Sequence, residues 1–292
     1  MSNTVNWSNP YACRDGAWLR GNLHTHTSPA SGCGEVLLER VLELYDRAGY
    51  DFLSISDHMT LTPAQHARMT CIPGVEWNSP TGEHTGVYAC DPALPAAQCC
   101  VSCQPALLDG LKDSDALVIL NHPNWQLRPH YRREELLAAQ YYDGIEIFNG
   151  VIRRLDGYEI STDKWDYLLA QGRRVLGFAS DDSHCEGDIG AAAIVVRSVS
   201  RTAEDILAAI KAGNFYCTSG AIITDIRRDG NHIEIETDGG QEIQVTGVGG
   251  TLLHRVHDHS LRYEFAGQSG YVRFTVYGHG SEMAWTQAFF TE

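Results

Sequence analysis

The chain has 292 residues, 43% of them hydrophobic, and a net charge of −15 from 22 basic and 37 acidic residues, without a block rich in lysine or arginine. A chain of this size can bury a large core, and the acidic balance disfavours binding of a nucleic-acid polymer through a basic face. No apolar run reaches the ~18 residues that a membrane span needs, and nine cysteines spread over so long a chain do not indicate a disulfide scaffold.

The first predicted element is a strand over residues 18–23 that ends at His24 and His26. Side chains alternate between the two faces of a strand, so these imidazoles point to the same side and can bind one metal ion. Two histidines separated by one residue also occur by chance. Their interpretation therefore depends on how many further ligands follow at the ends of later strands.

A βαβ unit is predicted next. Apolar residues recur at helical spacing over residues 35–48, and Gly49 ends this helix. Residues 51–56 form the following strand, which ends in Asp57 and His58. This arrangement places polar side chains at the carboxyl end of the second strand.

The alternation of strands and helices continues through residue 212. Further strands are predicted at residues 71–77, 85–90, 116–120, 144–149, 174–179 and 191–196. Further helices are predicted at residues 133–139, 162–171 and 202–212. Continuous apolar strands that alternate with helices indicate a parallel sheet covered on both faces, and barrels of this kind place catalytic residues at the carboxyl ends of their strands.

The pattern changes after residue 219. Short segments of alternating hydrophobicity, several of them separated by glycine turns, predict antiparallel strands at residues 222–226, 232–237, 242–246, 261–265 and 272–277. No helical pattern occurs there. We therefore expect two domains, a strand-and-helix domain over residues 1–219 and an antiparallel β module over residues 220–292.

Residues that can bind metal ions lie at or beside the ends of the predicted strands. The set comprises His24, His26, His58, Glu76, His84, His122, Asp182 and His184. Imidazole and carboxylate groups are ligands for zinc, manganese and iron. Each residue could instead cap a helix or bond a loop carbonyl, but that explanation does not account for eight together. Because eight ligands are too many for one tetrahedral ion, we expect two or three divalent ions, with Glu76 as a bridging carboxylate.

These motifs together resemble the polymerase-and-histidinol-phosphatase (PHP) family of metal-dependent phosphoesterases. The matching pieces, in family order, are His24-Thr25-His26, Ser56-Asp57-His58, Gly74-Val75-Glu76, Asn121-His122-Pro123 and Asp182-Ser183-His184. Residues 144–150 and the trailing β module make the chain most similar to the carbaryl-hydrolase-like (CehA/McbA) branch. The resemblance implies an α/β fold, a distorted parallel (β/α)7-type barrel followed by a small C-terminal antiparallel β module.

The resemblance also implies how up to three ions are held. One ion would take His24, His26, Glu76 and Asp182, a second would take Glu76, His84 and His122, and a third would take His58 and His184. Family members usually supply the third ion with an acidic residue or a histidine soon after the first motif. Ser31 stands there in this chain, which leaves the third site in doubt. Cys33 is close enough to substitute, although a nearby thiol is more often a small buried residue.

Two adjacent cations can share a water molecule, lower its pKa and bind the ester oxygen opposite it. We therefore expect hydrolysis of small-molecule phosphate monoesters or diesters by a metal-bridging hydroxide. Asp182 and His184 are the expected catalytic residues, because either could carry the proton to the leaving group. Phosphate binding usually requires arginine or lysine. The expected substrate-binding residues are Arg128, Arg153, Arg154, Glu146 and Asn149, with Arg132 and Arg133 as further candidates and Trp125 and Tyr131 for an aromatic group.

Two alternatives stay open. The same cluster could hydrolyse a carboxyl ester, a carbamate or an amide, since an activated water attacks a carbonyl as readily as a phosphorus atom. Several arginines in the pocket would favour phosphate, and an apolar pocket without them would favour the carboxyl-type substrate. The chain could also be a metal-binding module without catalytic activity.

The cellular setting is inferred from the start of the chain and from its cysteines. Residues 1–7 lack the basic and apolar regions of a signal peptide, so we expect a cytoplasmic protein with reduced thiols. We further expect a small-molecule substrate and no membrane contact, and we leave a homo-oligomer open. Four cysteines lie close together, Cys90, Cys99, Cys100 and Cys103. Their spacing does not provide two ligand pairs, so we expect ordinary thiols there rather than a zinc site.

Overall fold

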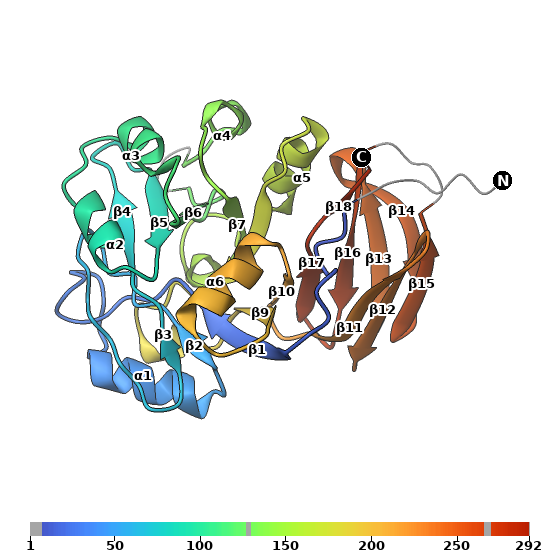
Figure 1. Ribbon diagram of the computed structural model, residues 1–292, viewed down its shortest axis with the longest axis horizontal. Helices are drawn as coiled ribbons and strands as arrows, with labels where there is room; N and C mark the ends of the chain where they lie inside the picture. Colours follow the sequence, from blue (N-terminus) through green and yellow to red (C-terminus); the bar gives the residue numbers. More distant parts are fainter. Residues whose placement is uncertain (1–7, 127–129, 266–269, 292) are drawn as a thin grey trace.

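The computed structural model describes residues 8–126, 130–265 and 270–291. Its helices are α1 (Leu38–Arg47), α2 (Ala93–Gln98), α3 (Gln104–Leu111), α4 (Arg133–Ala138), α5 (Thr162–Ala170) and α6 (Ala203–Lys211), with 3-10 turns η1 (Val151–Arg154), η2 (Glu186–Asp188) and η3 (Val248–Gly250). All six α-helices precede the C-terminal β module, which lies at one end of the molecule with α5 beside it (Figure 1). Within the described ranges, no helix is both long and apolar enough to cross a membrane.

The strands of the α/β part carry the candidate ligands. They are β1 (Ala17–Asn22), β2 (Phe52–Leu53), β3 (Thr70–Cys71), β4 (Gly74–Asn78), β5 (His84–Tyr88), β6 (Leu117–Leu120), β7 (Gly144–Asn149), β8 (Leu176–Ser180), β9 (Ala193–Ser198) and β10 (Phe215–Thr218). The C-terminal strands are β11 (Ile222–Asp229), β12 (His232–Asp238), β13 (Glu242–Gly247), β14 (Thr251–Val256), β15 (Ser260–Glu264), β16 (Tyr271–Tyr277), β17 (Met283–Thr286) and β18 (Phe289–Phe290).

Strong periodicity predicted the elements well. β7 has the predicted bounds, and α4, α5 and α6 lie within a residue of the predicted ends. The sequence patterns did not reveal α2 and α3, which lie in the cysteine-containing segment, or strands β10, β14, β17 and β18. α2 has no acidic residue in its first turn, whereas α4, of the same length, begins with Glu134 and Glu135, so α2 lacks the start signal that marks α4.

The five-stranded sheet has the order β4-β5-β6-β7-β8 and is mixed. β6, β7 and β8 pair in parallel, as expected, whereas β5 is antiparallel to both β4 and β6. The expected all-parallel arrangement is therefore wrong in this part. Only residues 79–83 connect β4 to β5, and so short a connection permits an antiparallel hairpin but not a crossover.

A ten-stranded sheet joins the two ends of the chain. Its order is β14-β13-β16-β17-β10-β9-β1-β2-β3, with β18 paired to β16, and β11, β12 and β15 form a separate sheet. β10 pairs on one side with β9 and on the other with β17. The expected boundary at residue 219 falls directly after β10 and stays a prediction, since β17 returns across it.

A common core connects these parts. Trp165 of α5 and Trp285 of β17 are both fully buried in the largest hydrophobic cluster, which also contains the apolar side chains of β6, β7 and β8. A buried ion pair adds a polar link, because Arg273 of β16 contacts Asp166 of α5 through Nε to Oδ1 at 2.8 Å and through Nη2 to Oδ2 at 2.6 Å. The C-terminal strands therefore support the α/β part that carries the site.

Backbone bridges bring the strand ends together. Thr25, beyond the end of β1, bridges to Ser183, beyond the end of β8. His58, beyond the end of β2, bridges to Glu76 within β4. These contacts place residues from distant parts of the sequence at one end of the α/β part.

Candidate metal centre

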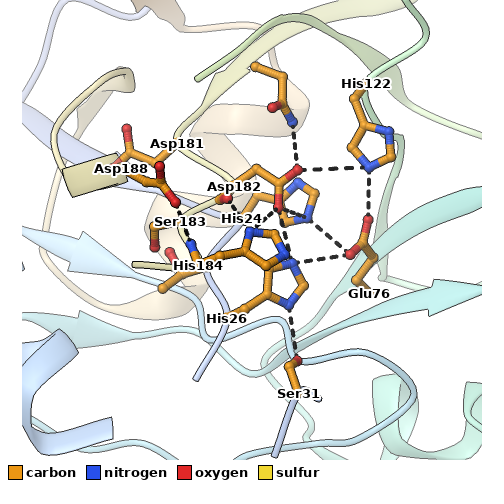
Figure 2. A network of polar contacts seen from close by, with 12 residues as sticks. His24, His26, Ser31, Glu76, His122, Asp181, Asp182, Ser183, His184 and Asp188 are labelled. Atoms are coloured by element: carbon orange, nitrogen blue, oxygen red, sulfur yellow. Dashed lines mark hydrogen bonds and ion pairs between the residues drawn. The ribbon is translucent and has the colours of Figure 1, made fainter. Parts of the chain in front are cut away.

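Four buried side chains converge at the joined strand ends. Nε2 of His24 and Nε2 of His26 each lie 3.2 Å from Oε2 of Glu76 and 3.1 Å from Oδ1 of Asp182. The four side chains are at most 5% exposed. Figure 2 shows these rings and carboxylates pointing toward one another. The four residues that the resemblance implies for the first ion are therefore together.

The unpaired atoms of this cluster fit a cation. Among the described residues, Nε2 of His24, Nε2 of His26 and Oδ1 of Asp182 are buried without a hydrogen-bond partner. An unsatisfied buried polar atom costs free energy, so several aimed at one point need a common partner. Imidazole nitrogens and carboxylate oxygens together form a donor set that suits a divalent transition metal.

Glu76 faces a second group of ligands through its other oxygen. Oε1 of Glu76 lies 3.0 Å from Nδ1 of His84 and 3.2 Å from Nε2 of His122. Asn121 donates a hydrogen bond to the same oxygen at 2.9 Å and so orients the carboxylate. With Oε2 directed to the first group and Oε1 to the second, Glu76 has the geometry of a bridging ligand.

A third group lies on the opposite side of His26. One ligand atom from each of His26, Cys33, His58 and His184 lies within 4.8 Å of the others. His58 and His184 were expected to meet here, and the structure brings them together. Burial alone would lower the pKa of His184, but a hydrogen bond with Cys33 and the charge of Asp182 raise it above its ordinary value.

The carboxylates of the centre are held in the charged form. Burial alone would raise the pKa of Glu76, but the charges of His24, His84 and His58 hold it well below its usual range. Burial likewise opposes the charge of Asp182, and His24 again lowers the pKa of that carboxyl well below its usual range. Both groups are therefore available as anionic ligands.

Two of the candidate ligands have strained backbones. The φ angles of His122 and Asp182 are 31° and 52°, in the left-handed region that is uncommon for non-glycine residues, although Asp and His enter it more often than most. Asp182 donates its main-chain N–H to the carbonyl of His24 at 3.0 Å, which fixes this conformation. Strain of this kind is characteristic of functional sites, because the surrounding structure must stabilise it.

Glu146 and Asn149 hold ligands in place behind the centre. Oε1 of Glu146 accepts from Nδ1 of His24 at 2.8 Å, and its Oε2 accepts the main-chain N–H of His122 at 2.7 Å. Asn149 donates to Oε2 of Glu146 at 2.9 Å and to Oδ2 of Asp182 at 3.1 Å. Both residues are buried with their polar groups directed to candidate ligands, which indicates a positioning role, and a substrate contact for Glu146 or Asn149 stays a prediction.

Ser31 also positions a ligand. Its Oγ donates to Oδ1 of Asp57 at 2.7 Å and accepts the main-chain N–H of His58 at 3.0 Å. The same oxygen lies 3.1 Å from Nδ1 of His26 (Figure 2), which must donate because the hydroxyl proton is already used. This bond directs Nε2 of His26 to the centre, in the manner of partners that fix the tautomer of a metal-binding histidine.

The candidate arginines mostly contact acidic side chains. Arg154 forms two 2.8 Å hydrogen bonds with Asp188, which itself accepts the main-chain N–H of His184 at 2.9 Å. Arg153 lies over the ring of Phe148. The remaining pairs are Arg132 with Glu135 and Arg133 with Asp163. Arg128 lies outside the described residues, and substrate binding by any of these arginines stays a prediction.

A cavity of about 640 Å³ is lined by Trp125 and His130, whose rings contact His122, although none of the eight candidate ligands lines it. Trp125 and Tyr131, the two aromatic candidates, both line it together with Tyr158 and Lys164. Trp125 contacts the ring of His122, with a centroid distance of 5.0 Å. The cavity therefore gives a small molecule a place to bind beside the ligand cluster.

His130 was missed by the sequence reasoning. It lines the cavity, is 8% exposed, and lies with its ring centroid 4.7 Å from that of His122. Burial and the neighbouring His122 lower its pKa to about 2, so this imidazole is neutral. His130 lies in a loop rather than at a strand end, and only its histidine identity could have indicated a role.

Glu146→Gln tests the positioning role. The amide cannot accept the His24 proton as a carboxylate does, so we expect a roughly 10- to 100-fold loss of metal affinity with little change in folding. Calorimetric titration of the metal-free protein with zinc measures this. Glu264→Gln, at an exposed position on β15, is the matched control. Unchanged zinc affinity in Glu146→Gln would contradict the assignment.

Comparisons with known proteins concern one segment of the chain and its fold. Residues 168–215, from the end of α5 into β10, match the PHP-associated family PHP_C. No curated protein matches the chain. One similar solved structure is a two-domain protein from Bacteroides vulgatus, described as containing a predicted PHP-like metal-dependent phosphoesterase. The alignment covers 94% of this chain and 94% of that chain, at 17% identity and with a TM-score of 0.53. The two chains share a fold.

A second solved structure aligns with only part of the chain. The lesion-specific endonuclease EndoQ from Pyrococcus furiosus is 12% identical, with 67% of this chain and 56% of that chain covered and a TM-score of 0.52. At these identities the likeness concerns the fold alone. The PHP-like resemblance of the motifs is thus matched by a PHP-associated segment and by a PHP-like fold.

Proposed function

We propose that the protein is a metal-dependent hydrolase of small-molecule phosphate esters. The observation that carries the proposal is the convergence of His24, His26, Glu76 and Asp182, whose ligand atoms lie within 4.8 Å of one another. Glu76 extends this group toward His84 with its second oxygen. Such a pair of ligand groups joined by one carboxylate is typical of sites that bind two cations and hydrolyse esters.

Divalent cations bound here would activate a water molecule and polarise the ester. The protein's own groups would then orient the reactants and carry protons. Asp182 offers Oδ1 to the ligand cluster, and its Oδ2, which accepts a hydrogen bond from Asn149, can accept a proton from the attacking water. We assign this proton transfer to Asp182 rather than to His184, whose ring belongs to the third group.

The adjoining cavity supports a small substrate with an aromatic or other planar leaving group. Trp125, Tyr131 and Tyr158 provide apolar surface, and Lys164 provides a cation. The net charge of −15 opposes approach of a nucleic-acid polymer. The endonuclease fold relative nevertheless makes damaged DNA a reasonable member of any substrate panel.

A carboxyl-type ester or carbamate is the second candidate. Among the described residues that line the cavity, the one arginine is Arg132, which forms an ion pair with Glu135. A pocket with few available guanidinium groups suits a neutral substrate better than a phosphate. The resemblance to the carbaryl-hydrolase-like branch agrees with this candidate.

We also infer that the α/β strands form a distorted barrel. The bridges from Thr25 to Ser183 and from His58 to Glu76 link β1 and β2 to the two edges of the five-stranded sheet. The closure is confined to the strand ends, where the ligands lie. Ligands from different strands that bind common ions would hold the strands of the barrel together, which would explain why the bridges lie beside the ligands.

A substrate panel with controlled metal content tests the proposal. The metal-free protein is loaded with manganese or zinc and assayed on aryl phosphate monoesters and diesters, aryl acetates, aryl carbamates and a damaged DNA duplex. Turnover of phosphate esters that is lost in His24→Ala and Asp182→Ala is the expected result. Full turnover in these variants would overturn the proposed function. Turnover of acetates or carbamates alone would favour the second candidate. Bound metal without any turnover would indicate an inert module.

A further inference from the structure

The third group of ligands contains a cysteine that the proposed function does not use. Cys33 lies in the loop that follows the first motif, and its Sγ is close to nitrogens of His26, His58 and His184. Cys33 is exposed, whereas His58 and His184 have side chains 25% and 17% exposed. This group therefore borders solvent, unlike the enclosed first group.

We propose that Cys33, His58 and His184 form a third metal site in which the Cys33 thiolate is a ligand, and that this site prefers zinc to manganese. The inference rests on the metal centre of the proposed function but not on the identity of the ester. Cys33 would provide a sulfur ligand at a site where the family resemblance leads us to expect an oxygen or nitrogen ligand.

Ser31, which stands nearer the position of the expected acidic ligand, cannot serve this site. Its hydroxyl donates to Asp57 and accepts from both His26 and the main chain of His58. Because these bonds occupy the oxygen, binding an ion would require breaking them. Cys33 is two residues further along the same loop and lies beside the two histidines that lack a third ligand.

His26 has its two nitrogens committed elsewhere. Nδ1 contacts Ser31, and Nε2 lies between Glu76 and Asp182 in the first group. His26 therefore separates the first site from the third rather than completing the third. Three ligands then remain for the third ion, which leaves one position of a tetrahedral ion open.

The two histidines are held in orientations suited to ligation. Nδ1 of His184 lies 2.7 Å from the main-chain carbonyl oxygen of Asp182, so the ring has Nε2 left to face an ion. Nδ1 of His58 is buried without a hydrogen-bond partner and lies 3.1 Å from Oε2 of Glu76. One ligand atom of His58 lies within 4.8 Å of ligand atoms of Cys33 and His184, and one lies as close to those of Glu76 and His84, so His58 stands between the third group and the second.

The donor set determines the expected metal. A thiolate is a soft ligand, and imidazole with thiolate binds zinc more readily than manganese, which prefers oxygen ligands. The first two groups contain carboxylates and accept either metal. Manganese should therefore fill the carboxylate-bridged positions but leave Cys33 as a free thiol, whereas zinc should also bind at Cys33.

Metal content and thiol chemistry test this without an activity assay. Wild type, Cys33→Ala and Cys100→Ala are made metal-free, loaded with zinc, desalted and analysed for bound metal. Cys100 is an exposed cysteine outside the third group and serves as the matched control. We expect about three zinc ions in wild type and Cys100→Ala and about two in Cys33→Ala.

Cobalt(II) and alkylation provide two direct readouts of sulfur ligation. Cobalt-loaded wild type should show a thiolate-to-cobalt charge-transfer band in the near ultraviolet that is lost in Cys33→Ala and retained in Cys100→Ala. Zinc, but not manganese, should protect Cys33 from iodoacetamide, as measured by peptide mass spectrometry. Equal zinc content in all three proteins together with unprotected Cys33 would overturn this inference alone, whereas wild type that binds no metal would overturn the proposed function as well.

Discussion

Glu76→Gln is expected to lower kcat/KM on the order of 10⁴-fold, with loss of both ions at the carboxylate-bridged positions. Glu76 contacts His24 and His26 through Oε2, and His84 and His122 through Oε1. Glutamine has the same length but no charge and only one oxygen, so it cannot join two ions. Elemental analysis and the hydrolysis assay on the best substrate of the panel measure the effect.

The Glu76 result needs a test for folding and a control. Circular dichroism and thermal unfolding of the metal-free proteins show whether Glu76→Gln retains the fold. Glu264→Gln removes the same charge from an exposed position and should leave metal content and turnover unchanged. If folded Glu76→Gln keeps its full metal content and turnover, the bridging role of Glu76 is wrong.

Arg273→Met is expected to lower the free energy of unfolding by about 3–5 kcal/mol. The substitution leaves the Asp166 carboxylate buried without its guanidinium, because Asp166 and Arg273 are only 6% and 4% exposed. Tyr271 would still donate to Oδ1 of Asp166 at 2.8 Å, but one hydroxyl cannot replace a paired charge. Urea unfolding of the metal-loaded protein measures the loss.

Two further variants show whether the unpaired charge is the cause. Asp166→Leu combined with Arg273→Met removes both charges and should recover much of the lost stability. Lys112→Met breaks the exposed pair with Asp109 and should cost no more than about 1 kcal/mol. A loss of similar size in Lys112→Met and Arg273→Met would show that burial of the pair does not matter.

The buried pair also connects stability to the site. Asp166 lies on α5, and Trp165 beside it belongs, with Trp285, to the core cluster that contains side chains of β7 and β8. Residues of β7 and residues directly after β8 position or provide ligands. A variant that loosens α5 should therefore weaken metal binding indirectly, in contrast to Glu76→Gln, which acts on the ligands without loosening the core.

The sequence by itself determined the strand-and-helix alternation and the main ligands. A strand permits side chains on one face to be identified by alternation, and parallel strands share the edge at which their carboxyl ends lie. These two local rules were enough to select His24 and His26 and to collect the other candidate ligands, whereas the family resemblance implied their grouping with Glu76 and Asp182. The second rule does not apply to His84, which begins β5 and reaches the same edge because β5 is antiparallel to β4 and β6.

Only the tertiary structure decided which polar side chains point into the ligand cluster and which hydrogen-bond the candidate ligands from behind. Glu146 and Ser31 looked like a substrate contact and a missing ligand, but each hydrogen-bonds a ring nitrogen of His24 or His26. Cys33 joined His58 and His184 because a loop folds back across distant strand ends. Local patterns specify which face of an element a residue occupies, whereas the direction of a side chain in a loop depends on contacts far away in the sequence.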